Sequence, residues 1–506
     1  MSALAQPLAA NLVQSVDWLA VAPPAIAAVV ALLVLVADLF VPEARKPLLG
    51  WASVAGLAAA ALMLLPLLDA DRSTFCVRGT HACSYTADRF TLVIQLLVLG
   101  GALLAALLSV TALKDADKRL PEGEYWFLLL SSAAGAALLP ASRDLATLIV
   151  ALEVASLPAF ALVGLRYGDR KSSEAALKFF LSSVTATAVS LMGISFVYAS
   201  TGTLYLTQVA DRIQHVDGQL QTLAQTGVVL TLVGFAFKTA AVPFHFWVPD
   251  TYVGAPLPIA AFLSVVGKAV GFSGLILVTV VAFPSYADVW GPALAALAAL
   301  TMTVGNVGAL RQQATRAYSA VRLLAWSSVG QAGYLLVPIA AAAYSDDAEH
   351  SVGSTVAYAL MYTAVNLGAF AVAALVGRTR TANRITDYRG LYATNPLAAL
   401  LMAFFLLCLA GLPPGIIGLF AKVTVFSAAV DAGLGWLAVL MAANVVIALF
   451  YYLQWTALLF RAPEGEPVKH RLPAPVTAAI TLTGVLAVAL SGAPQLILRF
   501  ADTTLF

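Results

Sequence analysis

Seven ionisable side chains lie inside apolar stretches of this 506-residue chain. A charge held at the centre of a bilayer costs about 2.5–3.5 kcal/mol on insertion scales, so residues of this kind mark ion or proton pathways by default. The seven residues are Glu153, Lys178, Lys238, His245, Lys268, Arg322 and Lys422.

The four lysines and the glutamate of this set are suited to proton transfer. Burial lowers the proton affinity of a lysine, and a neighbouring carboxylate raises it. A lysine balanced between these two effects can take up and release a proton near neutral pH. One acid, Glu153, cannot neutralise four lysines. The pattern therefore favours a proton relay, and a structural buried ion pair is the alternative.

Some members of the set have a simpler explanation. Arg322 and Lys178 lie near the ends of their apolar stretches, so each side chain can snorkel to the membrane surface. Glu153 lies nine residues after Asp144 and thirteen before Arg166. At 1.5 Å per residue it is roughly 14 and 20 Å from those ends, so it does not reach water easily.

The composition identifies the surroundings of these residues as a membrane. The chain is 61% hydrophobic and 11% charged, with a mean hydropathy of +0.90, whereas a soluble domain has about 25% charged residues. These values exclude a soluble globular enzyme, a disordered protein and, with a net charge of +2, a nucleic-acid binder. Three cysteines are too few for a Cys₄ zinc or iron–sulfur site. The predicted fold class is an all-α polytopic membrane protein.

The spacing of the charges predicts about fourteen membrane-spanning helices, since a span needs about 20 mostly apolar residues. The predicted spans are 20–41, 48–68, 90–113, 125–141, 144–165, 174–200, 224–250, 256–283, 289–309, 316–340, 352–377, 395–433, 434–460 and 474–498. The segment 395–433 would be roughly 58 Å long as one straight helix. It contains Pro413-Pro414, so it is either two spans or one broken span.

Basic residues decide between these alternatives, because Lys and Arg favour cytoplasmic loops. With fourteen spans, one set of alternating loops carries 17 Lys and Arg residues, among them Lys118 and Arg119. The other set carries 6, among them Arg78. Two spans in 395–433 would place the basic loop after Arg461 outside. The sequence therefore predicts one broken span and both termini on the outer side of the membrane.

Two cysteines lie in the predicted outer loop 69–89. Cys76 and Cys83 can form a disulfide in an oxidising compartment, and two free thiols are the alternative. Cys408 lies in the middle of a predicted helix, where a cysteine usually packs as a small apolar residue.

The seventh and twelfth predicted spans each combine a helix break with a lysine. Pro243 follows Lys238 by five residues, and Pro413-Pro414 precedes Lys422. Proline removes a backbone donor and interrupts a helix, which leaves backbone groups free to hold water or ions. Because the two spans are five apart they run in opposite directions, as in an inverted repeat of two five-helix units, helices 4–8 and 9–13. The predicted divisions are an N-terminal three-helix segment (1–124), two repeats (125–283 and 289–460) and a part with the fourteenth helix (461–506).

Polar side chains within the predicted spans can bridge the buried charges with water. Singly, each is more often a helix-packing contact than a relay member. These residues are Ser264, Asn306, Ser327, Ser328, Gln331, Tyr334, Tyr358, Tyr362 and Asn366.

Two motifs carry a family resemblance. FKTAAVPFHFWVPD at 237–250, followed by YVGAP at 252–256, resembles a signature of the antiporter-like membrane subunits of respiratory complex I, the bacterial proton-pumping NADH:quinone oxidoreductase. So does GLPP at 411–414 followed by GLFAK at 418–422, while the residues GII between them depart from the family pattern. The resemblance covers essentially the whole chain and is densest from about 150 to 425. Within the family the chain is most similar to the subunit N group, because Lys178 follows Glu153 by 25 residues and the chain ends after its fourteenth span.

The resemblance implies roles for the buried residues. Glu153 would be a carboxylate that pairs with a lysine and controls its proton affinity, Lys238 the lysine at the break of the seventh span, and Lys422 the terminal lysine of the relay. Lys178 and Lys268 would be further relay lysines, and His245 would line the hydrated axis. Quinone reduction elsewhere in the complex would drive protons outward through these residues.

The resemblance also implies partners. The chain would assemble in the bacterial plasma membrane with M-, L-, K-, J- and A-like subunits and bind no nucleic acid. FMN and the iron–sulfur clusters would belong to partner subunits, so this chain would hold no cofactor or metal and would meet NADH and quinone only through the complex. Two alternatives share the relay: a subunit of a multi-subunit sodium/proton antiporter, and a membrane subunit of a hydrogenase-type complex.

Overall fold

The computed structural model describes residues 16–77, 82–116, 120–463, 468–500 and 505–506. Arg78, Lys118 and Arg119, which enter the predicted charge asymmetry, lie outside these ranges. Within them, twelve helices are long and apolar enough to cross a membrane. The predicted all-α polytopic membrane class is therefore confirmed.

The first six predicted spans correspond to single helices. These are α1 (Trp18–Asp38), α2 (Pro47–Leu62), α3 (Arg89–Asp115), α4 (Glu122–Leu138), α5 (Leu145–Gly164) and α6 (Arg170–Thr201). The 17 residues of α4 fall below the 18 that define the twelve long helices. A short helix, α7 (Leu206–Arg212), follows α6 and has no counterpart in the predicted spans.

The later spans include the interrupted ones. The helices are α8 (Gln221–Thr239), α9 (Trp247–Gly254), α10 (Leu257–Phe262), α11 (Lys268–Ile276), α12 (Ala287–Leu310), α13 (Ser319–Ala341), α14 (Ala348–Gly377), α15 (Leu391–Thr394), α16 (Pro396–Ala410), α17 (Ile416–Asp431), α18 (Gly435–Phe460), α19 (Ala474–Gly492) and α20 (Gln495–Leu498). As predicted, the seventh span is divided into α8 and α9, and the twelfth into α16 and α17.

Both breaks begin with a left-handed residue that ends the first half of the span. Ala240 follows α8 with φ of +69°, and Gly411 follows α16 with φ of +82°. A proline follows each of them by three residues, Pro243 and Pro414. The left-handed turn redirects the chain, and the proline prevents the helix from continuing.

The predicted continuous span 256–283 contains two irregularities that the sequence did not indicate. π-Helical turns at Leu263–Gly267 (η5) and Leu277–Ala282 (η6) flank α11. Such turns displace backbone hydrogen bonds and occur often at functional sites. Lys268 is the first residue of α11, directly after the first of these turns.

A short hairpin is the exception to the helical fold. Strands β1 (Arg72–Cys76) and β2 (Cys83–Ala87) pair antiparallel, and a disulfide joins Cys76 to Cys83. Arg72 lies 2.9 Å from Asp17, the N-cap residue of α1. The Arg72 hydrogen bond lowers the pKa of the Asp17 carboxyl. The hairpin is thus tied to the beginning of the first helix.

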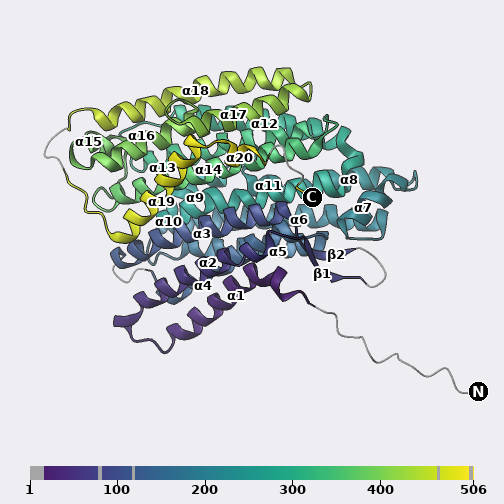
Figure 1. Cartoon of the computed structure of the whole chain (residues 1–506), viewed down its shortest axis with the longest axis horizontal. Coiled ribbons are helices and arrows are strands. Elements are labelled where there is room, and N and C mark those ends of the chain that lie inside the picture. Colours follow the sequence, from purple (N-terminus) through teal and green to yellow (C-terminus); the bar gives the residue numbers. More distant parts are fainter. Residues whose placement is uncertain (1–15, 78–81, 117–119, 464–467, 501–504) are drawn as a thin grey trace, which may run out of the picture.

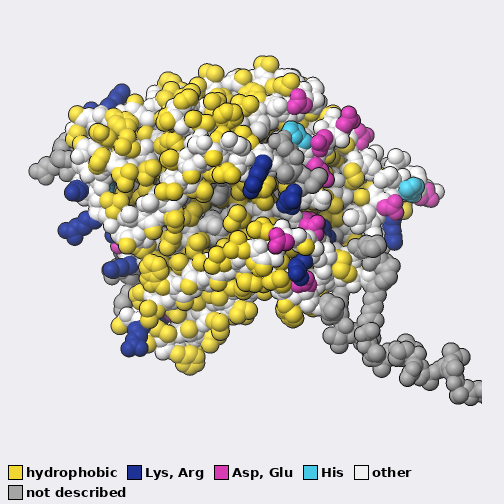
Figure 2. All heavy atoms as spheres, viewed as in Figure 1, with side chains coloured by type: hydrophobic (Ala, Val, Ile, Leu, Met, Phe, Trp, Pro, Cys, Tyr) yellow, Lys and Arg dark blue, Asp and Glu magenta, His cyan; other side chains and the backbone are white. Residues whose placement is uncertain are grey.

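The helices lie side by side in one bundle, with α1 and α18 at opposite edges (Figure 1). The most apolar stretches of α13 and α14 are 94% and 83% buried, whereas those of α1 and α18 are 33% and 39% buried. Hydrophobic side chains cover much of the visible surface, and one end of the molecule, at the left of the view, shows Lys and Arg with almost no acidic side chains (Figure 2). The span Leu257–Ala282, which contains α10 and α11, is 89% buried, so the core lies around α10, α11, α13 and α14.

Candidate functional site

Lys238 lies in the last turn of α8 and is only 4% exposed. Its ammonium lies 5.3 Å from the ring centre of Phe160 on α5 and 5.0 Å from that of Phe179 on α6. Phe179 stacks on Trp247 of α9, with ring centres 4.3 Å apart and planes at 11°. Aromatic faces attract a cation. Among the described residues, none forms a hydrogen bond or ion pair with the Lys238 ammonium.

Glu153 lies on α5 and is partly buried. It accepts a hydrogen bond of 2.7 Å from the Thr187 hydroxyl on α6. Its charge acts on Lys238 at longer range, but no lysine of the described ranges lies within 4 Å of its carboxylate. The direct Glu–Lys pair that the family resemblance implies is therefore not formed in this structure.

Lys178 has acidic partners other than Glu153. Its ammonium lies 2.7 Å from the Glu174 carboxylate and 2.8 Å from that of Asp250 on α9. Arg322 on α13 lies 3.5 Å from the other carboxylate oxygen of Asp250. Asp250 was not among the predicted site residues, although it lies inside the family motif at 237–250. The structure thus groups Lys178 with Arg322, in a partly exposed cluster.

Lys268 is 2% exposed, and no described residue accepts a hydrogen bond from its ammonium. Three residues further along α11, Gly271 packs directly against the end of α8. A Cβ atom on Gly271 would lie 2.4 Å from both the amide nitrogen and the hydroxyl of Thr239. This close crossing brings the helix of Lys268 against the helix end that carries Lys238.

One group of polar side chains lies next to Lys268. Ser264, one turn earlier in η5, accepts a hydrogen bond of 2.7 Å from the Asn366 amide through its hydroxyl. The Tyr362 hydroxyl donates to the Ser264 carbonyl at 3.1 Å and lies 2.8 Å from the Ser328 hydroxyl. These contacts join η5 to α14 and α13.

A second group connects α13 to the break of the twelfth span. The Gln331 side chain accepts a hydrogen bond from Tyr358 and donates to Tyr452 at 3.2 Å. It also donates to the carbonyl of Leu409 at 3.4 Å. Gln331 lies one turn after Ser328 on α13, so the two groups are adjacent on one helix.

Lys422 lies on α17 and is 3% exposed. It binds the C-terminal end of α16, at the break of the twelfth span. Its ammonium donates to the carbonyls of Leu409 at 2.9 Å and Ala410 at 2.7 Å. These carbonyls belong to the last turn of a helix, where no amide of the same helix is left to bind them. Leu409 therefore accepts hydrogen bonds from both Gln331 and Lys422.

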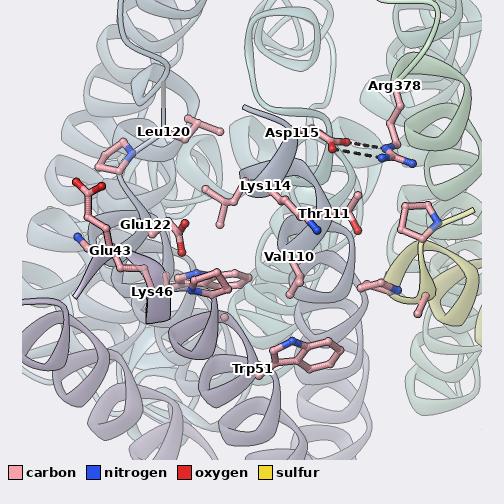
Figure 3. A pocket seen from close by; sticks show the side chains of 18 of the residues that line it. Glu43, Lys46, Trp51, Val110, Thr111, Lys114, Asp115, Leu120, Glu122 and Arg378 are labelled. Carbon is pink, nitrogen blue, oxygen red and sulfur yellow. Dashed lines mark hydrogen bonds and ion pairs between the residues drawn. The ribbon is translucent and has the colours of Figure 1, made fainter. Parts of the chain in front are cut away.

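His245 lies in the turn between α8 and α9, with its ring centre 5.5 Å from that of Trp326 on α13. It is partly buried, and among the described residues it forms no hydrogen bond with any of the three buried lysines. Elsewhere, a cleft of about 960 Å³ opens at the basic end of the bundle, beside α2, α3 and α4 (Figure 3). Arg378 and Asp115 pair at its edge, at 2.6 Å, and the cleft includes none of the predicted site residues.

Sequence reasoning missed several residues of these groups. Thr187, Tyr452 and the aromatic pair Phe179 and Trp247 were not predicted, because threonine and aromatic residues are common in any membrane helix. Asp250 was not predicted because it is the last residue of the predicted span 224–250. Only their contacts distinguish them. Among the residues that the structure describes, no three His, Cys, Asp or Glu side chains come together as metal ligands. Proton transfer between amines and hydroxyls is the chemistry that this arrangement can support.

Known proteins share both the sequence and the fold. The family model described as NADH:quinone oxidoreductase/Mrp antiporter, TM matches residues 142–448. NADH-quinone oxidoreductase subunit N 2 of Streptomyces griseus is 74% identical over 98% of this chain and 96% of its own length. Subunit N of Trichlorobacter lovleyi is 35% identical, over 97% of this chain and 98% of its own.

Solved structures agree with this similarity. A chain of respiratory complex I from Thermus thermophilus with bound aureothin is 31% identical, with a TM-score of 0.74 and coverage of 94% of this chain and 98% of that one. A chain of the Mrp complex from Dietzia has the same fold, with a TM-score of 0.82 at 21% identity and 96% coverage of both chains. This chain therefore belongs to the NADH:quinone oxidoreductase/Mrp antiporter membrane family and, within it, to the NADH-quinone oxidoreductase subunit N group.

Proposed function

We propose that this chain translocates protons as a membrane subunit of NADH:quinone oxidoreductase, driven by quinone reduction in other subunits. One observation carries the proposal. Three lysines, each at most 4% exposed, lie inside a membrane protein without a carboxylate within 4 Å among the described residues. Since burying such groups is costly, their retention inside the bundle favours a role in moving charge.

The proposed path runs from Lys238 to Lys268 and then to Lys422. The close crossing at Gly271 joins the first two. The hydrogen-bonded groups around Ser264 and Gln331 extend from the helix of Lys268 to the carbonyl that binds Lys422. Glu153 acts on Lys238 through its charge. His245 lies in the break between α8 and α9, where its ring contacts Trp326.

The remaining assignments follow from the family. We propose that the chain packs against M-, L-, K-, J- and A-like subunits, and that partner subunits hold FMN and the iron–sulfur clusters. We propose further that it lies in the bacterial plasma membrane with both termini outside. The division into repeats at 125–283 and 289–460 also remains a proposal. The matched breaks at Ala240 to Pro243 and Gly411 to Pro414 support it.

The test is a Lys238→Ala variant in the assembled complex. NADH oxidation linked to proton pumping should fall about tenfold, since the first carrier of the path is lost. The amount of complex on a native gel should stay unchanged, because the wild-type lysine makes no hydrogen bond with the residues described here. Normal pumping by the assembled variant would remove Lys238 from the path.

A sodium/proton antiporter subunit is the second candidate function. The matching family model also covers Mrp antiporters, and a chain of an Mrp complex has the same fold at 21% identity. Purification through a C-terminal tag in mild detergent separates the two candidates. Recovery of flavin and iron–sulfur subunits supports the first. Recovery of small membrane partners alone would favour the antiporter.

A further inference from the structure

Asp250 is the centre of a charged cluster outside the proposed path. One carboxylate oxygen lies 2.8 Å from the Lys178 ammonium, and the other lies 3.5 Å from the Arg322 guanidinium. The cluster thus joins α9 to α6 and to α13. The side chains of Asp250 and Lys178 are 37% and 45% exposed, so the cluster is open to its surroundings on one side.

Two aromatic rings on the helices of this cluster connect it to the surroundings of Lys238. Phe179 directly follows Lys178 on α6, and its ring faces the Lys238 ammonium at 5.0 Å. Trp247 lies one turn before Asp250 on α9 and stacks on Phe179. The Trp247 indole also donates to the carbonyl of Phe237, next to Lys238, at 3.3 Å. Each ring of the stack is therefore carried by the same helix as one partner of the Lys178–Asp250 ion pair.

The position of α9 depends on these contacts. It has only eight residues and is separated from α8 by the break, so its own backbone hydrogen bonds stabilise it little. At its end, Gly254 packs so closely on α6 that a Cβ atom there would lie 2.7 Å from the Lys171 carbonyl. The ion pair, the ring stack and this close contact together hold α9 against α6.

We propose that Asp250 is a positioning residue that controls proton access to Lys238. Its ion pair with Lys178 keeps the Phe179–Trp247 stack closed between the partly exposed cluster and the buried amine. Arg322, at 3.5 Å from the same carboxylate, is a second partner towards which Asp250 can shift. This exchange breaks the link from Lys178 to α9 and leaves Lys178 paired with Glu174 on its own helix. The stack then loosens and gives protons a route to Lys238. The inference rests on the proposed relay through Lys238.

The first measurement is the number of protons pumped per electron by the whole complex carrying Asp250→Asn. Without the ion pair the ring stack no longer closes, so this ratio should fall about threefold. NADH oxidation should continue. Asp250→Glu keeps the charge and should restore most of the ratio. A matched control is Asp431→Asn. Asp431 is the last residue of α17, which follows the break of the twelfth span, and its exposed carboxylate contacts only Ser427 among the described residues. This control should leave the ratio unchanged.

A double-variant comparison separates positioning from a general loss of stability. If Lys178 and Asp250 act through one ion pair, Lys178→Met combined with Asp250→Asn should lower the ratio no more than Asp250→Asn alone. Additive losses would overturn the proposal.

The ring stack gives an independent test should Asp250→Asn fail to assemble. Trp247→Leu removes the ring and should lower the ratio, whereas Trp247→Phe keeps a ring and should retain it. Equal ratios for these two variants would overturn the proposal. A normal ratio for Asp250→Asn beside a defective Lys238→Ala would refute the role of Asp250 alone. Normal pumping by Lys238→Ala would refute the relay itself.

Discussion

The three buried lysines are enclosed by different chemical groups, and this difference decides what each can do. Lys422 donates to two carbonyls at 2.9 and 2.7 Å, so its charged form is directly hydrogen-bonded. Lys238 faces two aromatic rings, which attract a cation more weakly than hydrogen-bond acceptors do. Lys268 has no hydrogen-bond acceptor among the described side chains and carbonyls. Of the three, Lys422 is therefore the one whose ammonium has hydrogen-bond acceptors among the described residues.

Glu153 is expected to tune the first of these lysines through its charge. Glu153→Gln keeps the size of the side chain and can keep a hydrogen bond to Thr187, but it removes the charge that acts on Lys238. Proton pumping should fall about threefold or more, whereas Glu153→Asp should retain part of it. The measurement is proton pumping per NADH oxidised in membrane vesicles. Thr187→Ser, which keeps the hydroxyl, is the control; activity of both Glu153 variants equal to wild type would disprove the role.

At the scale of elements, the contact between α8 and α11 brings the relay helices together. A Cβ on Gly271 would meet backbone and side-chain atoms of Thr239 at 2.4 Å and the Lys238 carbonyl carbon at 2.8 Å. Backbone atoms cannot move aside as a flexible side chain does, so a larger residue must separate the two helices.

Gly271→Ala should therefore destabilise this pair of helices by about 1–3 kcal/mol and reduce pumping. Gly267→Ala is a matched control on the other side of Lys268, because a Cβ there would meet only a leucine methyl group at 3.9 Å. The checks are the amount of complex that survives heating and the number of protons pumped per electron. If the two variants are equally stable and pump equally well, the close contact between α8 and α11 at Gly271 is not needed for the proposed proton path.

The elements that the sequence predicted and those it missed differ for a physical reason. The breaks near Pro243 and Pro413 were predicted from proline beside a buried lysine, and the spans from their apolar length. Proline alone does not mark a break, since Pro158 and Pro338 lie inside the unbroken helices α5 and α13. The π-helical turns beside Lys268 carry no such residue, because their extra backbone residue depends on packing against neighbouring helices. The sequence also does not show that Lys178 forms an ion pair with Asp250, 72 residues away, and not with Glu153. Such choices require the helices to be placed in space.

At the scale of the whole molecule, the charges are distributed unevenly along the bundle. In Figure 2, the left end shows Lys and Arg with almost no acidic side chains, whereas most visible Asp, Glu and His side chains lie towards the other end, together with further Lys and Arg. The cluster of Lys178, Asp250 and Arg322 belongs to helices whose nearby loops carry Arg166 and Arg316. If the basic end is cytoplasmic, protons taken up there would reach Lys238 through the cluster and leave beyond Lys422.

This orientation predicts opposite labelling of two loops that flank α13. Thr315 lies in the loop before α13, and Asp346 in the loop after it, and both are exposed. In intact cells a membrane-impermeant maleimide should label Asp346→Cys at once and Thr315→Cys only after permeabilisation, because positive loops remain inside. The native cysteines give little background, since Cys408 is buried and Cys76 is bonded to Cys83. Reversed labelling would place the basic end outside, and the direction of the proposed proton path would reverse with it.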